Sequence, residues 1–172
     1  MVHGDVVLEG REASHAAGGL TADPPVACLA AGHCLLTPAV SSKGRPYRRI
    51  VFEGYTILIG KGDVENDRLT FEVAEPEDLW LHVAGGVAGS HVVVRNPDPL
   101  VPPPRAVVER AAELAAWYSK GRGAGGKVEV HVCRAADVSK PRGFAPGKVL
   151  LARWQRLRVY PRGVEPRATS GE

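Results

Sequence analysis

Short runs of β-branched and aromatic residues, separated by turn-forming residues, characterise the chain from residue 45 to residue 161. This pattern is typical of a sheet of short strands. The runs at 47–52 and 55–59 flank Glu53 and Gly54, which predicts a tight hairpin. Further strands are predicted at 69–73, 78–83, 90–95, 127–133, 149–153 and 156–160.

One segment, about 105–120, has the spacing of a helix instead. Its apolar face consists of Val107, Val108, Ala111, Leu114, Ala115 and Tyr118. Pro104 suits the first turn of this helix, and Gly121 suits its end. A helical turn is also predicted at 65–67, capped by Asp63. Because strands outnumber helices and most connections are too short for crossovers, we predict an α+β fold, in which one main helix packs on a mainly antiparallel sheet.

The remaining residues flank a single domain. Residues 1–44 mix Ala, Gly, Ser and Pro without periodicity, and they hold too little bulky apolar material for a core of their own. We therefore predict an irregular N-terminal extension (1–44), one domain (45–161) and a flexible tail (162–172). A chain of 172 residues with 44% hydrophobic residues suits one such domain.

The composition argues against a secreted or membrane-spanning protein. The chain has no run of about 18 apolar residues, and its first residues lack the basic start of a signal peptide. Three cysteines are few and odd in number for a disulfide framework. We expect a cytoplasmic protein with free thiols. Neither the cysteines near residue 30 nor His82, His91, His131 and Cys133 have the spacing of a known zinc site, so we expect no metal and no cofactor.

The two halves of the chain differ in charge. From Arg105 onward, the chain has fourteen Lys and Arg residues and six Asp and Glu residues. Before Arg105 it has eight Lys and Arg residues and thirteen Asp and Glu residues. Such asymmetry favours a positive surface that binds a polyanion. The basic residues that we expect to hold phosphates are Lys140, Arg142, Lys148, Arg153 and Arg156. Trp154 lies among them, and it either stacks on a base or packs inward.

Polar side chains interrupt the two most apolar predicted strands. Four of them are candidate binding residues: Asp78, His82, Ser90 and His91. Even spacing puts Asp78, Trp80 and His82 on one strand face, which is either a second core layer or a ligand surface. We expect the four to shape a binding surface, with Asp78 positioning the Gly-rich turn at 84–89 so that an RNA backbone can approach it. Catalysis by Ser90 with a His and an Asp is an alternative, but no nucleophile-elbow pattern surrounds Ser90.

Several spaced motifs together point to a known family. They are Gly54–Lys61, Glu65–Thr70, Asp78–Val83, Gly89–Val94, Ala111–Lys120, Val128–Val132, Lys140–Gly143 and Pro146–Val149. Their order resembles the RNA-binding domain of the NFACT proteins, NFACT-R, in its stand-alone form. In large NFACT proteins this domain is the C-terminal part of the ribosome-quality-control subunit, which holds tRNA on a stalled large ribosomal subunit.

The resemblance implies an RNA-binding module of translation or ribosome-associated quality control, with tRNA or ribosomal RNA as ligand and the large ribosomal subunit as a further partner. The N-terminal domain and coiled coil of the large NFACT proteins do not fit in this chain, so their tail-adding activity is not carried over. No catalytic residue is assigned. Two alternatives stay open: a module that binds a protein partner in a translation factor complex, and an RNA-processing enzyme that uses Asp78, His82, Ser90 and His91.

Overall fold

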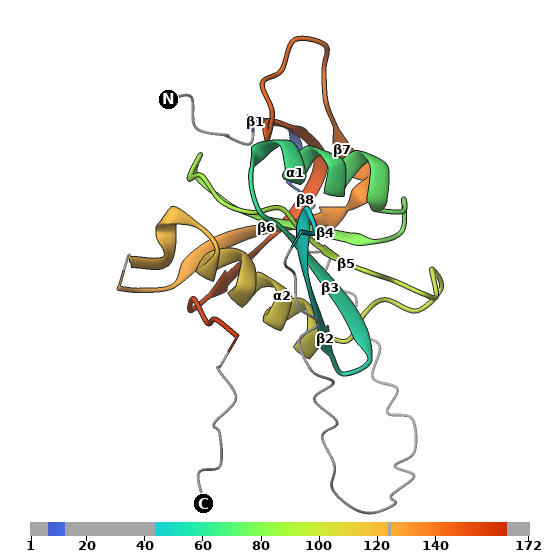
Figure 1. Ribbon diagram of the computed structural model, residues 1–172, viewed down its shortest axis with the longest axis vertical. Coiled ribbons are helices and arrows are strands. Elements are labelled where there is room, and N and C mark those ends of the chain that lie inside the picture. The colour runs from blue at the N-terminus through green and yellow to red at the C-terminus, as the bar shows by residue number, and fades with distance from the viewer. Residues whose placement is uncertain (1–6, 13–43, 124, 165–172) are drawn as a thin grey trace, which may run out of the picture.

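The computed structural model describes residues 7–12, 44–123 and 125–164, and a curled sheet with helices on both faces forms this part of the molecule (Figure 1). Within it, the strands follow the order β1-β8-β6-β4-β5-β3-β2, and β7 pairs with β8 off this path. Their bounds are β1 Val7–Glu12, β2 Tyr47–Phe52, β3 Tyr55–Gly60, β4 Leu79–Val83, β5 Val92–Val94, β6 Val128–Arg134, β7 Val138–Ser139 and β8 Leu150–Val159. All the described pairings are antiparallel except that of β1 with β8, so the predicted α+β class is confirmed.

The predicted hairpin at 47–59, with its turn at Glu53 and Gly54, is confirmed. Strands β2 and β3 pair from Tyr47 opposite Gly60 to Phe52 opposite Tyr55. Glu53 and Gly54, the two turn residues, have φ values of 48° and 80°. Two consecutive positive φ angles give a turn whose twist matches that of the strands, which is why the loop needs only two residues.

The main helix, α2 (Arg105–Trp117), covers one face of the sheet, as the apolar spacing predicted. Val107, Ala111 and Leu114 are fully buried on its inner side. They pack against inward-facing residues of the strands, among them Ile57 and Leu81. The helix starts after Pro104, whose carbonyl accepts a hydrogen bond from the Val107 N–H at 2.9 Å.

The opposite face carries α1 (Asp63–Arg68), which continues as a π-helical turn, η1 (Leu69–Val73). The strand predicted at 69–73 is therefore wrong. Leu69 and Thr70 are neighbours and both are buried, which a helical turn allows and a pleated strand does not, because successive strand residues face opposite sides. The expected cap by Asp63 is also wrong, because Gly62 is the N-cap residue and Asp63 starts the helix.

Strand β8 replaces the two strands predicted at 149–153 and 156–160. It runs without a break over ten residues because different strands pair with its two halves. Strand β1 pairs with Leu150 to Trp154, and β6 pairs with Gln155 to Val159. Continuous pairing keeps the chain extended through Trp154 and Gln155, where the sequence pattern suggested an interruption.

The N-terminal stretch supplies one described element, β1, which lies beside β8 (Figure 1). The rest of residues 1–44 and residues 165–172 of the tail lie outside the described residues, so the division of the chain near residue 45 stays a prediction. Among the described helices, none combines the length and the apolar character required to cross a lipid bilayer.

Gly89 provides a test of how closely the sheet and the end of α2 are packed. A Cβ atom at this position would lie 2.9 Å from the Cβ of Ser119 and 3.0 Å from a methyl group of Val83. We predict that Gly89→Ala lowers the free energy of unfolding by about 1–3 kcal/mol, because the backbone must shift to relieve these contacts. Urea denaturation measures this, with Gly126→Ala as the matched control. A Cβ at Gly126 meets no atom within 4 Å, so equal losses in both variants would contradict the prediction.

Candidate nucleic-acid interface

The strand face that carries Trp80 and His82 turns inward, towards α1. Trp80 is completely buried and His82 is 1% exposed. His91, just before β5, is also completely buried, and its ring lies edge-on to both, with ring centres 4.8 Å from Trp80 and 5.2 Å from His82. The sequence left open whether this face is a second core layer or a ligand surface, and the burial of Trp80, His82 and His91 shows that it is a core layer.

The Thr70 hydroxyl connects this layer to the helix above it. It lies 2.8 Å from Nδ1 of His91 and 2.8 Å from the carbonyl oxygen of Asn66, and it accepts a hydrogen bond from the Trp80 indole N–H at 3.1 Å. The Asn66 amide extends the connection, because its oxygen accepts from the His91 backbone N–H and its nitrogen donates to the Gly89 carbonyl. Asn66 and Thr70 of the helix thus form one buried polar network with Trp80 and His91 of the sheet.

Burial dominates the electrostatics of His91. The loss of solvent lowers the pKa of His91 well below its ordinary value, and the neighbouring His82 and Lys140 lower it further. Hydrogen bonding by the backbones of Gly147 and Asn66 acts in the opposite direction without reversing the shift. His91 is therefore neutral at physiological pH and works as a hydrogen-bonding core residue.

A row of polar side chains runs from this network across the sheet to its outer strands. His82 on β4 stands opposite His131 on β6, and His131 stands opposite Arg156 on β8. His131 is 3% exposed and its ring lies 5.9 Å from that of Trp154. The three histidines follow one another side by side in this row, and only the arginine at its end reaches solvent.

Asp78 joins the two strands β4 and β5 at their open end, whereas the sequence predicted that it positions the turn between them. Its carboxylate, 1% exposed, accepts hydrogen bonds from the backbone N–H groups of Glu75 and Asn96 and from the Arg95 guanidinium at 2.8 Å. These partners lie where β4 begins and β5 ends, far along the strands from the Gly-rich turn at 84–89. The expectation that Asp78 positions that turn is wrong. Ser90 is next to the turn, where its hydroxyl donates to the Gly60 carbonyl at 2.7 Å.

Lys140 belongs to the architecture of the loop between β7 and β8. Its side chain is 23% exposed, and its ammonium group pairs with the Asp67 carboxylate of α1 and donates to the Ala145 carbonyl. The other oxygen of Asp67 accepts from the Gly147 N–H at 3.1 Å. These bonds fasten the loop to α1 and thereby determine where Arg142 is presented.

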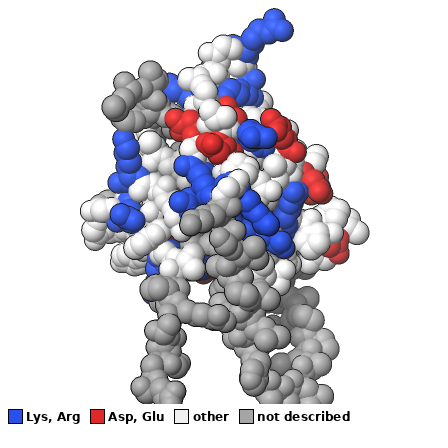
Figure 2. Space-filling view, viewed as in Figure 1, with Lys and Arg blue, Asp and Glu red and all other residues white. Residues whose placement is uncertain are grey.

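The other basic candidates reach solvent. Arg142 is exposed, Lys148 is half-buried, and Arg153 and Arg156 have side chains that are 77% and 50% exposed. Figure 2 shows Lys and Arg side chains gathered over the middle of the face seen there, below a band of acidic side chains over α1. Trp154 does not share this exposure, because 93% of its surface is buried in the core beneath α1. The inward packing of Trp154, and not base stacking, is the arrangement found.

The structure adds one basic region that the sequence reasoning missed. The turn at 84–89 and the segment after α2 lie side by side, joined by a bridge between Gly89 and Ser119 and by the Lys120 N–H, which donates to the Ala88 carbonyl. The second of these Gly-rich loops carries three exposed cations: Lys120, Arg122 and Lys127. The alternation of Gly with Lys and Arg in 120–127 is the signal that could have identified the region.

Comparison with known proteins gives the family. The NFACT protein RNA binding domain matches residues 47–153. The chain belongs to this family. It is 38% identical over 123 residues to the Rqc2 homolog RqcH of Streptococcus suis, which covers 71% of this chain and 21% of that protein. Against the Rqc2 homolog RqcH of Bacillus subtilis the identity is 38% over 96 residues, covering 56% of this chain and 16% of the relative.

A solved structure agrees with this assignment. The C-terminal part of the fibronectin/fibrinogen-binding protein from Streptococcus suis superimposes with a TM-score of 0.62 at 35% identity, over 73% of this chain and 49% of that one. The chain spans about a fifth of the length of the curated relatives named above. The NFACT-R resemblance inferred from the motifs is confirmed, and the match contains the whole polar network and most of the basic candidates.

The lowered pKa of His91 predicts how the stability of this NFACT-R domain depends on pH. Unfolded His91 binds a proton below its ordinary pKa of about 6.5, whereas the folded residue resists protonation until a lower pH. The free energy of unfolding should therefore fall as the pH drops below about 6.5, by up to about 1.4 kcal/mol per pH unit from this group. Urea denaturation at pH 7.5, 6.5 and 5.5 measures it. His91→Asn should flatten the dependence, and identical slopes in both proteins would contradict the assignment.

Asp78 allows a second test of the site. We predict that Asp78→Ala lowers the free energy of unfolding by about 2–4 kcal/mol, because it leaves the Arg95 guanidinium and two backbone donors without their acceptor. Glu75→Ala is the control, since the Glu75 carboxylate also lies near Arg95, at 3.3 Å, but is 75% exposed. Exposed ion pairs contribute little, so the control should lose less than about 1 kcal/mol. Comparable losses in the two variants would show that Asp78 is not the organising group.

Proposed function

We propose that this NFACT-R domain binds structured RNA, tRNA first and ribosomal RNA second, as part of ribosome-associated quality control. The observation that carries the proposal is its membership of the NFACT RNA-binding family together with the exposed cations of its second half. Lys and Arg bind phosphates and release counterions, which gives affinity without sequence preference. The proposed role implies a cytoplasmic location and contact with the large ribosomal subunit.

Two kinds of residue contribute to this proposed interface. Arg142, Lys148, Arg153 and Arg156 lie on the surface that contacts RNA, and Arg142, Lys148 and Arg156 contact its phosphates. Asp78, His82, Ser90 and His91 act from beneath, by holding the elements under this surface in place. His91 bonds to Thr70, Ser90 bonds to the Gly60 carbonyl, and Asp78 bonds to Arg95. Lys140 belongs with the second group through its pair with Asp67. The Gly-rich loops beside Lys120 and Arg122 offer an uncovered backbone that an RNA strand can approach closely.

A protein-binding role is the second candidate, because the similar solved structure is that of a fibronectin/fibrinogen-binding protein. An RNA-processing enzyme is less favoured. Its suggested residues Asp78, His82 and His91 are almost fully buried and Ser90 is bonded to a backbone carbonyl, whereas an enzyme requires such groups to converge in an open pocket.

Salt dependence distinguishes RNA binding from protein binding. We predict that replacing Arg142, Arg153 and Arg156 together by Gln weakens binding to a tRNA transcript. The slope of log affinity against log salt should flatten by about 0.7–0.9 for each phosphate contact removed. Fluorescence anisotropy between about 50 and 200 mM salt measures both quantities.

The matched control removes the same charge elsewhere, by replacing Arg49, Arg68 and Arg105 with Gln on β2, α1 and α2. These three side chains are exposed, and the control should leave the slope nearly unchanged. Equal flattening in both triple variants would mean that net charge alone attracts RNA. Absence of tRNA binding by the unaltered protein at low salt would overturn the proposal and favour a protein partner.

A further inference from the structure

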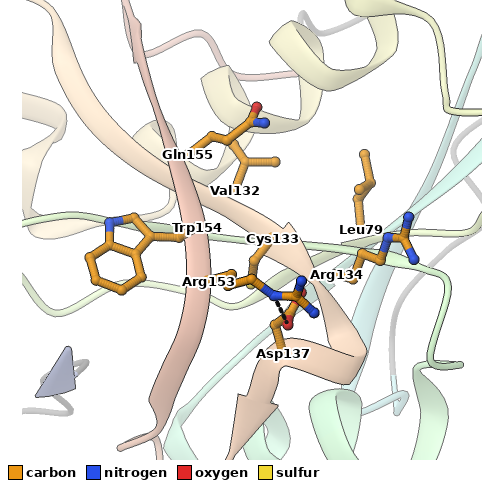
Figure 3. A pocket seen from close by; sticks show the side chains of 8 residues that line it. All are labelled: Leu79, Val132, Cys133, Arg134, Asp137, Arg153, Trp154 and Gln155. Carbon is orange, nitrogen blue, oxygen red and sulfur yellow. Dashed lines mark hydrogen bonds and ion pairs between the residues drawn. The ribbon is translucent and has the colours of Figure 1, made fainter. Parts of the chain in front are cut away.

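A hollow of about 330 Å³ opens where β4, β6 and β8 lie next to one another (Figure 3). Its lining combines apolar, amide and charged groups: Leu79, Val132, Cys133, Arg134, Asp137, Arg153, Trp154 and Gln155. The strand register brings these residues together, because Leu79 stands opposite Arg134 and Val132 stands opposite Gln155. Residues from three separate parts of the sequence therefore form one concave surface.

The floor of the hollow is apolar and is less buried than the core beneath α2. Leu79 and Val132 continue the core that packs against the helix, but both are only half-buried. Leu81 and Val130, the next residues on the same strand faces, are completely buried. Burial therefore decreases along both strands, and an apolar surface is left facing outward at this end of the sheet.

The rim of the hollow carries two planar cations whose charge is already balanced. Arg134 is 61% exposed and lies 3.2 Å from the Glu77 carboxylate, and Arg153 is 77% exposed and lies 3.1 Å from that of Asp137. Figure 3 shows the Arg153–Asp137 contact directly. Two carboxylates beside two guanidinium groups leave no local excess of positive charge. The hollow is therefore unsuited to a simple anion, and each flat guanidinium group lies against a carboxylate.

Gln155 supplies the remaining polar group. Its side chain is exposed, and its amide offers donors and an acceptor, which is what the edge of a base requires. Trp154 does not serve as a stacking surface here. In Figure 3 its ring extends to the other side of β8 from Gln155, and it belongs to the core beneath α1.

We propose that this hollow binds one unpaired RNA base, lying on Leu79 and Val132 and against the guanidinium planes of Arg134 and Arg153, with its edge bonded to Gln155. The inference rests on the proposed RNA-binding function and deepens it by naming the part of the RNA that is recognised. Unstacked bases are bound on apolar and guanidinium surfaces of this kind. The volume of the hollow lies at the low end of the roughly 300–1,000 Å³ of small-molecule sites, as one base requires.

The decisive variant keeps the charge and removes the flat surface: Arg134→Lys combined with Arg153→Lys. The probes are a single-stranded RNA of twelve nucleotides of mixed sequence and a fully paired duplex of the same length, with affinity measured by anisotropy. We expect the variant to bind the single strand roughly five- to tenfold more weakly and the duplex as before, because stacking on a guanidinium plane is lost. Arg68→Lys combined with Arg105→Lys is the matched control and should bind both probes as the unaltered protein does.

Gln155→Ala is a second variant, because it alters one exposed side chain and leaves the ion pairs intact. It too should weaken binding of the single strand selectively. Unchanged single-strand affinity in both variants, with thermal unfolding like that of the unaltered protein, would overturn the inference while the proposed function stands. Absence of any RNA binding by the unaltered protein would overturn both.

Nuclear magnetic resonance tests the ligand class without an oligonucleotide. Adenosine monophosphate should shift the side-chain amide signals of Gln155, and inorganic phosphate at the same concentration should not. Equal shifts with both probes would show an anion site and overturn the assignment to a base. Shifts with neither probe would do the same.

Discussion

The shared hydroxyl of Thr70 is the interaction on which the arrangement of this domain depends. It is the partner of the His91 ring and of the Trp80 indole N–H, in a layer that solvent does not reach. Buried donors and acceptors without partners cost about 1–3 kcal/mol each, so the helix that carries Thr70 has one favourable position over the sheet. The π-helical turn places Leu69 in the apolar core while its neighbour Thr70 reaches the rings.

The position of α1 then determines the surface. Asp67, three residues before Thr70, holds both Lys140 and Gly147, and so anchors the loop between β7 and β8 to the helix. The helix that bonds to the buried histidine layer thus also positions the loop that carries Arg142. The sequence suggested that Lys140 contacts phosphate, but in the structure its ion pair with Asp67 attaches this loop to α1. The basic surface is arranged by the core although the core itself does not contact solvent.

Charge and apolar surface are distributed differently over the two candidate RNA contacts. The exposed cations on the loops and at the end of the histidine row suit phosphates. The hollow beside Gln155, with its charges balanced by Glu77 and Asp137, suits an uncharged flat group. A domain with both features can hold an RNA backbone electrostatically and test locally whether a base is unpaired. The cost of separating a paired base would then discriminate against duplex RNA.

The sequence by itself determined most strands of the sheet, the β2–β3 turn, α2 and the family, because each depends on local spacing or on motifs that are read along the chain. It also indicated that Trp80 and His82 share a strand face. Only the tertiary structure decided what that face contacts, since α1 comes from residues whose pattern predicted a strand at 69–73. The partners of Asp78 and Lys140 and the hollow between β4, β6 and β8 were likewise undetermined, because pairing between residues distant in sequence leaves no periodic signal along one chain.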